Sequence, residues 1–229
     1  MRPCTILQKE LASLAGVPDA VADMVVPLGE PDVAVASILE GNPLSDDWMA
    51  PLDVPGDHLV AWSGTLAQDL FGNEPRTWMK AGHDTFEAFC DQVAPNLDAL
   101  DRTLLFRPHA RHVLSDPQGS LDFLRRREQE PFGLALSPAD MLLPSMLDVL
   151  EDHVERILTF VAPRARIIFL EDAQPGDDGE SMQPAPLGEG VLPHTQVREL
   201  LHAHLPEEMP VVVKPSETAT ALEWLGIEH

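Results

Sequence analysis

The chain of 229 residues is long enough for one α/β domain with a substantial core, and 44% of its residues are hydrophobic. Its 38 acidic residues against 15 basic ones give a net charge of −23, which repels nucleic acid and anionic membranes and excludes both as expected partners. This acidity reflects either an ordinary solvated surface or a salt-adapted host. No apolar run approaches the roughly 20 residues of a membrane span. Because the first residues also lack the apolar region of a signal peptide, we expect a cytoplasmic protein.

The first sixty residues predict short strands joined by loops. Residues 4–7 and 24–28 are short apolar runs that suit strands, whereas 33–39 suits either a strand or part of a helix. Prolines and glycines then mark a loop-rich connection over residues 42–57. The run at 58–62 predicts a buried strand, because it is short, apolar and followed by a turn of small residues.

From residue 84 onward the patterns of helices and strands alternate. Apolar residues at three- and four-residue spacings predict helices over about 84–97, 117–127, 149–158, 197–201 and 219–225. Short apolar runs predict strands at 103–106, 132–136, 167–170 and 211–213. The stretch 171–190 is rich in Pro, Gly and Asp and predicts a long irregular loop, of the kind that usually carries function or moves.

These patterns together predict an α/β fold. Continuous apolar strands separated by helices argue for a parallel sheet with helices on its faces. The weak N-terminal strands bring the count to seven or eight, which fits a (β/α)8 TIM barrel with room for a shortened or irregular N-terminal part. A doubly wound open sheet is the alternative. No repeat or linker divides the chain, so we expect residues 1–229 to form a single domain.

Charged side chains and histidines follow four of the predicted strands, and the residues after parallel barrel strands converge on one face. They are Arg107, His109, Arg111, His112, Asp140, Glu171, Asp172 and Lys214. Guanidinium groups offer paired donors to phosphate or carboxylate oxygens, so Arg107 and Arg111, with the two histidines and Asp140 nearby, predict a ligand-binding pocket for an anion. The same cations can instead neutralise the neighbouring acids in a structural network.

Three of these side chains are candidates for catalysis: Glu171, Lys214 and His109. Glu171 can act as acid or base, or hold a cation. Adjacent residues at a strand end point in opposite directions, so at most one of Glu171 and Asp172 is expected to face the pocket. Lys214 can form a Schiff base or bind an anion, or it can pair with Glu217.

Other signals are weaker. Glu189, between two glycines, either reaches back over the site as a ligand-binding residue or marks a turn. His109 and His112 have a spacing that binds metal on a helix, but Pro108 argues against a helix here. The common motifs of hydrolases, nucleotide-binding loops and zinc proteases are absent, and two cysteines are too few for a disulfide framework or a zinc cluster.

Taken in order, several motifs resemble the xylose-isomerase-like TIM-barrel family of sugar phosphate isomerases and epimerases. They are SGT (63–65), LLFRPH (104–109), FGLALSPAD (132–140), IIFLEDA (167–173), PLGEG (186–190) and VVVKP (211–215). The resemblance covers residues 58–216. It implies a barrel fold, an isomerase or epimerase activity on a sugar-like substrate, and a divalent metal (Mn, Mg or Zn) held by glutamate, aspartate and histidine at the strand ends.

The positions that the resemblance assigns to the metal ligands hold other residues. The fifth-strand glutamate falls on Arg107, the sixth-strand aspartate and histidine on Ser137 and Asp140, the seventh-strand histidine near Phe169, and the final glutamate near Lys214. Two of these positions are now cationic, and a cation cannot offer exchangeable coordination sites. We therefore predict no metal and no cofactor, unless the ligands are shifted to Asp140, Glu171 and His109.

Three functions are compatible with these residues. The first is a barrel that has lost metal and activity and serves as a binding or scaffold protein for a protein partner. The second is a metal-independent enzyme or binder of a small anionic or sugar-like ligand, with Arg107, His109 and Lys214 opposed to Glu171. The third is a metal-dependent isomerase or epimerase with shifted ligands. A deep basic pocket at the strand ends would favour the second function, and a mouth filled by side chains the first.

Overall fold

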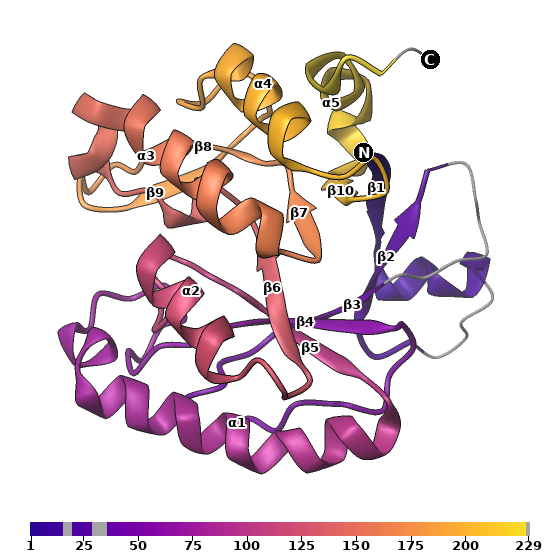
Figure 1. Ribbon diagram of the computed structural model, residues 1–229, viewed down its shortest axis with the longest axis vertical. Helices are drawn as coiled ribbons and strands as arrows, with labels where there is room; N and C mark the ends of the chain where they lie inside the picture. Colours follow the sequence, from indigo (N-terminus) through magenta and orange to yellow (C-terminus); the bar gives the residue numbers. More distant parts are fainter. Residues whose placement is uncertain (16–19, 29–35, 228–229) are drawn as a thin grey trace.

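The computed structural model describes residues 1–15, 20–28 and 36–227, and it folds into a closed barrel (Figure 1). Its strands are β1 (Arg2–Leu7), β2 (Asp23–Pro27), β3 (Ala36–Leu39), β4 (His58–Trp62), β5 (Thr103–Arg107), β6 (Phe132–Leu136), β7 (Ile167–Phe169) and β10 (Pro210–Val213). The strands follow one another in chain order, and β10 pairs with β1 to close the barrel. The predicted α/β barrel is therefore confirmed, and the open-sheet alternative is wrong.

The irregularity allowed for in the N-terminal part is also present. β2 pairs antiparallel with both β1 and β3, whereas all the other barrel pairs are parallel. Antiparallel neighbours need only a short connection, and a parallel crossover usually needs an α-helix. The described part of the β1–β2 connection holds only the short 3-10 helix η1 (Lys9–Ala15). Of the stretch predicted at 33–39, residues 36–39 form β3, and 33–35 lie outside the described residues.

The α-helices lie over the later strands (Figure 1). They are α1 (Lys80–Leu100), α2 (Pro117–Arg126), α3 (Leu150–Arg156), α4 (His194–His204) and α5 (Thr218–Leu225). The short 3-10 helices are η2 (Pro75–Trp78), η3 (Ala139–Met141), η4 (Pro144–Val149), η6 (Ala162–Arg164) and η7 (Pro215–Glu217), and α3 runs on into the π-helical turn η5 (Ile157–Val161). By contrast, the β3–β4 connection at 40–57 is described throughout and contains no helix. Within the described residues, no helix is both long enough and apolar enough to span a membrane.

Two layers of apolar side chains explain the continuous apolar strands. Inside the barrel, every strand contributes to one cluster, which consists of Cys4, Val25, Ala36, Val60, Leu105, Ala135, Ile167, Phe169 and Val212. Outside the barrel, Phe106 of β5 packs against Phe86 of α1 at 4.8 Å and Phe123 of α2 at 5.5 Å between ring centroids. Both faces of β4 to β7 and of β10 are therefore largely buried, which is why their sequences show no polar alternation.

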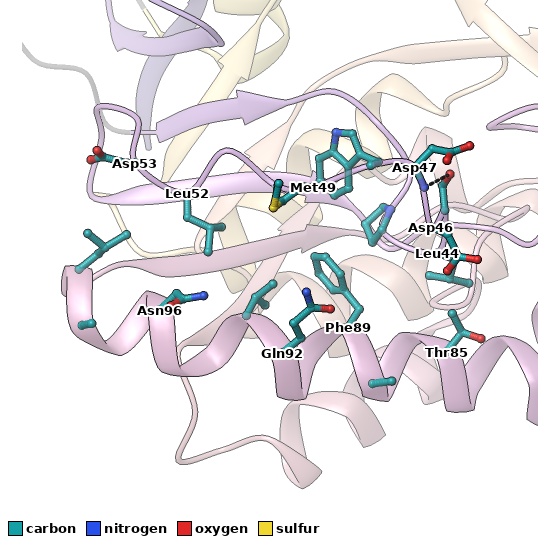
Figure 2. Close-up of a pocket in the computed structure, with 18 residues that line it drawn as sticks. Leu44, Asp46, Asp47, Met49, Leu52, Asp53, Thr85, Phe89, Gln92 and Asn96 are labelled. Carbon is teal, nitrogen blue, oxygen red and sulfur yellow. Dashed lines mark hydrogen bonds between the residues drawn. The ribbon is translucent and has the colours of Figure 1, made fainter.

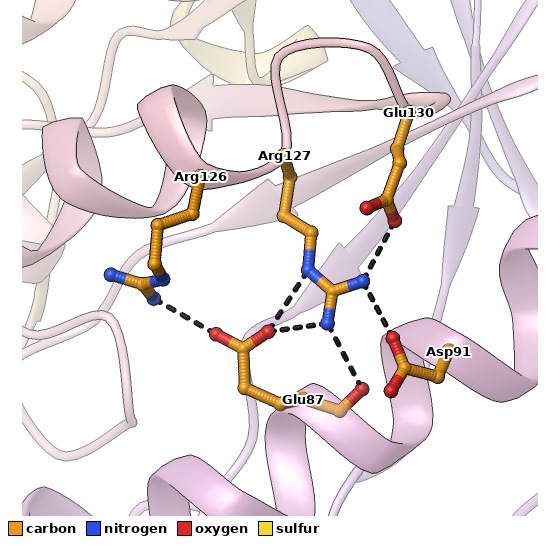
Figure 3. Close-up of polar contacts among 5 residues, drawn as sticks. All are labelled: Glu87, Asp91, Arg126, Arg127 and Glu130. Atoms are coloured by element: carbon orange, nitrogen blue, oxygen red, sulfur yellow. Dashed lines mark hydrogen bonds and ion pairs between the residues drawn. The ribbon is translucent and has the colours of Figure 1, made fainter.

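A polar cluster joins α2 to α1 on the outer surface (Figure 3). The guanidinium of Arg127 bonds to Glu87 and donates to Asp91 at 2.7 Å and to Glu130 at 2.8 Å. Arg126 adds a bond of 2.9 Å to Glu87. The basic end of the predicted helix at 117–127 therefore fixes the two helices to each other.

The prediction of an irregular loop over 171–190 is wrong in part. Strands β8 (Asp172–Pro175) and β9 (Met182–Ala185) form an antiparallel hairpin outside the barrel. Gly179, in the turn between them, has a φ of +65°, which suits glycine. The two strands read DAQP and MQPA, so neither carries the β-branched residues or the alternation that would predict a strand.

Candidate functional site

A cavity of about 550 Å³ opens where the carboxyl ends of the barrel strands converge. Five of its lining residues stand at or just after these ends: Trp62 of β4, Arg107 of β5, Asp140 after β6, Glu171 after β7 and Lys214 after β10. The barrel brings these positions together because its parallel strands all end at the same rim. The mouth of the barrel is therefore open and carries charged groups of both signs.

The guanidinium of Arg107 is the central group of the cavity. Its Nε donates to Asp140 Oδ2 at 2.5 Å, and its other arm bonds to Glu171 Oε2. The same group lies over the rings of Trp62 and Phe169, at 4.8 and 4.4 Å from their centroids. Burial alone would lower the pKa of Arg107, but the charges and hydrogen bonds of the two carboxylates raise it above its usual value. Arg107 is thus a permanent cation, 9% exposed, in a cage of acids and aromatic rings.

An aromatic wall stands beside this cage. Trp62 and Phe71 meet edge to face at 5.2 Å, and the His109 ring lies 4.8 Å from Phe71. His112 is fully buried behind the wall, stacked on Phe71 at 5.5 Å, with its Nε2 2.8 Å from the carbonyl oxygen of Leu70. His112 therefore supports the wall and is not among the residues that line the cavity.

Both histidines are neutral near pH 7. Burial, together with the charges of Arg107 and Arg111, lowers the pKa of His109 to about 3. Burial and the neighbouring His109 lower the pKa of His112 to about 3 as well. The Nδ1 of His109 accepts the backbone N–H of Arg111 at 3.1 Å, which leaves its proton on Nε2. The positive charge of the cavity therefore comes from arginine and lysine.

The β8–β9 hairpin forms one side of the cavity and is attached to the barrel by Arg111. The Arg111 guanidinium donates to the backbone carbonyl of Glu180 at 2.5 Å. Asp178 stabilises the hairpin turn by accepting the backbone N–H groups of Glu180 and Ser181, each at 2.9 Å. Met182 and neighbouring residues of β9 then line the cavity. The predicted ligand-binding residue Arg111 thus also holds the segment that encloses the site.

The PLGEG motif has a structural explanation. The buried Asp172 carboxylate accepts the backbone N–H groups of Gly188, Gly190 and Leu192 at 3.0 to 3.1 Å. A Cβ at Gly190 would lie 2.2 Å from Asp172 Oδ1, so only glycine fits there. Glu189 is exposed and is not among the residues that line the cavity. The motif therefore folds a loop around one fixed carboxylate, and Glu189 marks its turn.

Lys214 lines the cavity and makes one long contact with an acid. Its Nζ lies 3.9 Å from Glu217 Oε1, and its side chain is about one-third exposed. A contact of this length at a partly exposed position is weak, so the ammonium group is free to meet a ligand.

Of the eight residues predicted to catalyse or to bind a ligand, six line the cavity: Arg107, His109, Arg111, Asp140, Glu171 and Lys214. His112 and Glu189 do not. Asp172 also contributes to the lining, so the expectation that at most one of Glu171 and Asp172 would do so is wrong.

The sequence analysis missed Trp62, Phe71 and Met182, which supply the apolar walls. Trp62 ends a predicted strand, and this position could have identified it. Phe71 and Met182 lie in segments without any periodic signal.

No protein-family model matches the chain, and no curated protein sequence matches it. Solved structures do match the chain in fold. A D-tagatose 3-epimerase-like protein superposes with a TM-score of 0.60 at 10% identity, over 85% of this chain and 78% of that one. A xylose isomerase domain protein from Planctomyces limnophilus gives a TM-score of 0.54 at 15% identity, over 75% of this chain and 57% of that one. The chain has the fold of the xylose isomerase-like TIM barrels.

The chain is shorter than two of these structural neighbours. It spans 57% of the length of the Planctomyces protein and 62% of the probable 3-DHS dehydratase AsbF of Bacillus anthracis, which superposes over 74% of this chain with a TM-score of 0.51 at 8% identity. Its β3–β4 connection contains no helix, whereas a complete (β/α)8 barrel has a helix after each strand. The resemblance drawn from six short motifs is therefore confirmed for the fold.

The residues present do not fit the divalent metal that this fold family implies. In the described ranges, no three His, Cys, Asp or Glu side chains are grouped to hold a metal ion. The carboxylates of Asp140 and Glu171 both bond to the guanidinium of Arg107, and His109 Nδ1 already accepts the backbone N–H of Arg111. A divalent cation at these carboxylates would meet the fixed positive charge of Arg107.

Proposed function

We propose that this chain is a diverged, metal-independent barrel that binds a small sugar-like ligand with an anionic group at the carboxyl ends of its strands. The observation that supports this proposal is Arg107, paired with Asp140 and Glu171 in a cavity that remains open at about 550 Å³. A cavity of this size suits a small molecule. Because the barrel mouth is open, a ligand binder is favoured over an inert scaffold.

The guanidinium replaces part of what a metal would do. It supplies a permanent charge and directed N–H donors, and these can neutralise a developing or resident oxyanion. It offers no exchangeable coordination sites, so it cannot chelate two oxygens of a hydroxy-ketone as a metal does. The site therefore keeps the means to bind and orient a polar ligand and gives up the metal-assisted route.

The other groups of the cavity define the chemistry of the ligand. Lys214, and Arg111 at the hairpin, supply positive charge for a phosphate or carboxylate. The oxygens of Asp140 and Glu171 that Arg107 leaves unbonded can accept ligand hydroxyl groups. Phe71, which lines the cavity and is 48% exposed, offers an apolar surface for the C–H groups of a sugar. The names of the solved neighbours, an epimerase-like and an isomerase-domain protein, support a sugar-like ligand.

Catalysis by Glu171, Lys214 and His109 remains a proposal within this site. His109, with a pKa of about 3, is neutral and can only donate from Nε2 at physiological pH. Proton exchange would then fall to Glu171 and Lys214, which line the same cavity.

Thermal shift measurements with pentose and hexose phosphates, the free sugars and inorganic phosphate test this function. We expect stabilisation by at least one sugar phosphate, unchanged by EDTA, and lost in Lys214→Met. Lys80→Met is the matched control, because Lys80 is an exposed α1 residue outside the cavity.

Metal analysis by plasma mass spectrometry, after dialysis against manganese, completes the test. Near-stoichiometric retained manganese, or a ligand effect that requires manganese, would overturn the proposal. Lack of a shift with every sugar phosphate would overturn the ligand class.

A further inference from the structure

A second concave surface lies on the outside of the barrel, between α1 and the loop at 43–53 (Figure 2). Its volume is about 790 Å³, and it shares no lining residue with the strand-end cavity. The groove follows α1 from Thr85 to Leu100, which is about 22 Å at 1.5 Å per residue. A groove of this length suits a polypeptide segment better than a compact small molecule.

The α1 wall of the groove is free of charge. Five of its exposed or half-exposed members are spaced three or four residues apart: Thr85, Ala88, Gln92, Asn96 and Ala99. Leu100, 40% exposed, ends this wall. Other exposed positions of the same helix do carry charges: Lys80, Asp84, Asp91 and Asp98. Small and neutral residues at this spacing let another helix approach closely along a seam.

In the loop at 43–53, opposite α1, apolar side chains line the groove and the position of Trp48 is fixed by packing. The Trp48 ring stacks on Phe89 at 6.2 Å, and a Cβ at Gly41 would lie 2.2 Å from Trp48 Nε1. Beside it, Met49 is 84% exposed, although it lines the groove. Exposed apolar side chains in a preformed groove mark a binding surface.

The rim of the groove is acidic. Asp46 and Asp47 lie near the Thr85 end, and Asp53 lies at the Asn96 end (Figure 2). No lysine or arginine is among the residues that line it. Negative charge at both ends of a neutral groove selects a segment that carries positive charge at both ends.

The position of the groove in the fold identifies the kind of segment. A (β/α)8 barrel places a helix after each strand, yet the described β3–β4 connection at 40–57 contains none. Among the described residues, only this connection lines the groove opposite α1. We propose that a basic amphipathic α-helix of another protein docks in this groove, with its apolar face on Trp48 and Met49 and its cations at the acidic rim. A second copy of this chain is disfavoured, because its net charge is −23.

The test uses two fluorescein-labelled synthetic helices of about 18 residues, long enough to cover about 22 Å. Both carry the same leucine–alanine face, and one has lysines where the other has glutamates. Fluorescence anisotropy with the whole chain should show binding of the lysine peptide, weakened by salt, and none of the glutamate peptide.

Matched variants locate the contact. Ala88→Arg places a bulky cation in the groove and should raise the Kd at least about tenfold, whereas Ala81→Arg, exposed on α1 outside the groove, should not. Asp46→Asn, Asp47→Asn and Asp53→Asn together should raise the Kd severalfold and flatten its salt dependence. The charge-matched control combines Asp98→Asn, Asp148→Asn and Asp177→Asn, three exposed acids outside the groove.

Three results would overturn the inference. They are no binding of the lysine peptide, equal binding of both peptides, and equal effects of Ala88→Arg and Ala81→Arg. Sedimentation velocity adds a fourth: a wild-type dimer that only Ala88→Arg dissociates would assign the groove to self-association. None of these outcomes depends on the ligand of the strand-end cavity.

Discussion

Replacing Arg107 with methionine is the most direct perturbation of the strand-end site. The side chain keeps much of its apolar volume, but Asp140 and Glu171 lose the cation that both of them contact. Their side chains are only 16% and 18% exposed, so water compensates little of the lost interaction. Removing one partner of a buried ion pair typically costs 3–5 kcal/mol, and we expect a loss of about 3 kcal/mol in the unfolding free energy at pH 7.

Urea denaturation at pH 7 measures this cost. A triple variant, Arg107→Met with Asp140→Leu and Glu171→Met, leaves no buried charge and should recover most of the loss.

The control is Arg156→Met, which breaks an exposed helical pair with Asp152. Exposed pairs contribute about 0.5 kcal/mol or less, so this variant should be nearly as stable as the wild type. The reasoning about Arg107 is refuted if both single variants cost the same, or if the triple variant recovers none of the stability lost in Arg107→Met.

The remaining predictions concern Arg107, the buried His112 behind the aromatic wall, and Arg127 on the outer surface. Arg107→Glu places a third carboxylate beside Asp140 and Glu171, so manganese should raise the Tm of this variant and leave that of the wild type unchanged; an equal response would contradict it. Because the pKa of His112 is about 3 in the folded chain and near 6.5 when unfolded, the unfolded chain takes up this proton first, and stability is lost as the pH falls from about 6.5 to 3. His112→Gln should flatten this loss by up to about 1.4 kcal/mol per pH unit in urea titrations, and an unchanged slope would argue against a neutral buried histidine. Arg127→Met should cost about 2 kcal/mol in the same assay, because Arg127 joins α1 to α2, whereas the exposed Arg125→Met should cost less than about 0.5 kcal/mol.

Much of this fold could be predicted because its strands are buried on both faces. The runs at 58–62, 132–136 and 211–213 coincide with β4, β6 and β10 or differ from them by one residue. Parallel strands also made it possible to expect that residues such as Arg107 and Glu171 would converge, although they are distant in sequence. This convergence follows from topology, and no detail of packing was needed.

Pairing partners and strand direction left no comparable signal. The apolar run of β2 would be the same for parallel and for antiparallel pairing. The sequence therefore could not show that β2 runs antiparallel to β1 and β3. The β8–β9 hairpin pairs strands of low β propensity, and its backbone hydrogen bonds do not depend on side-chain pattern. The sequence allowed two interpretations of Arg107, as a donor to a ligand or as the partner of acids. Only the three-dimensional structure shows which charges meet, because spacing along the chain does not determine it.

The surroundings of Arg107 favour a site organised around a cation. The carboxylates of Asp140 and Glu171 both bond to the guanidinium, and Trp62 and Phe169 stack on it from the barrel wall and the barrel interior. Phe169 lies near the position where the family resemblance expects a metal-binding histidine, and its ring contacts the cation there. Acids, rings and guanidinium stabilise one another, which supports our proposal of a ligand site organised by a cation.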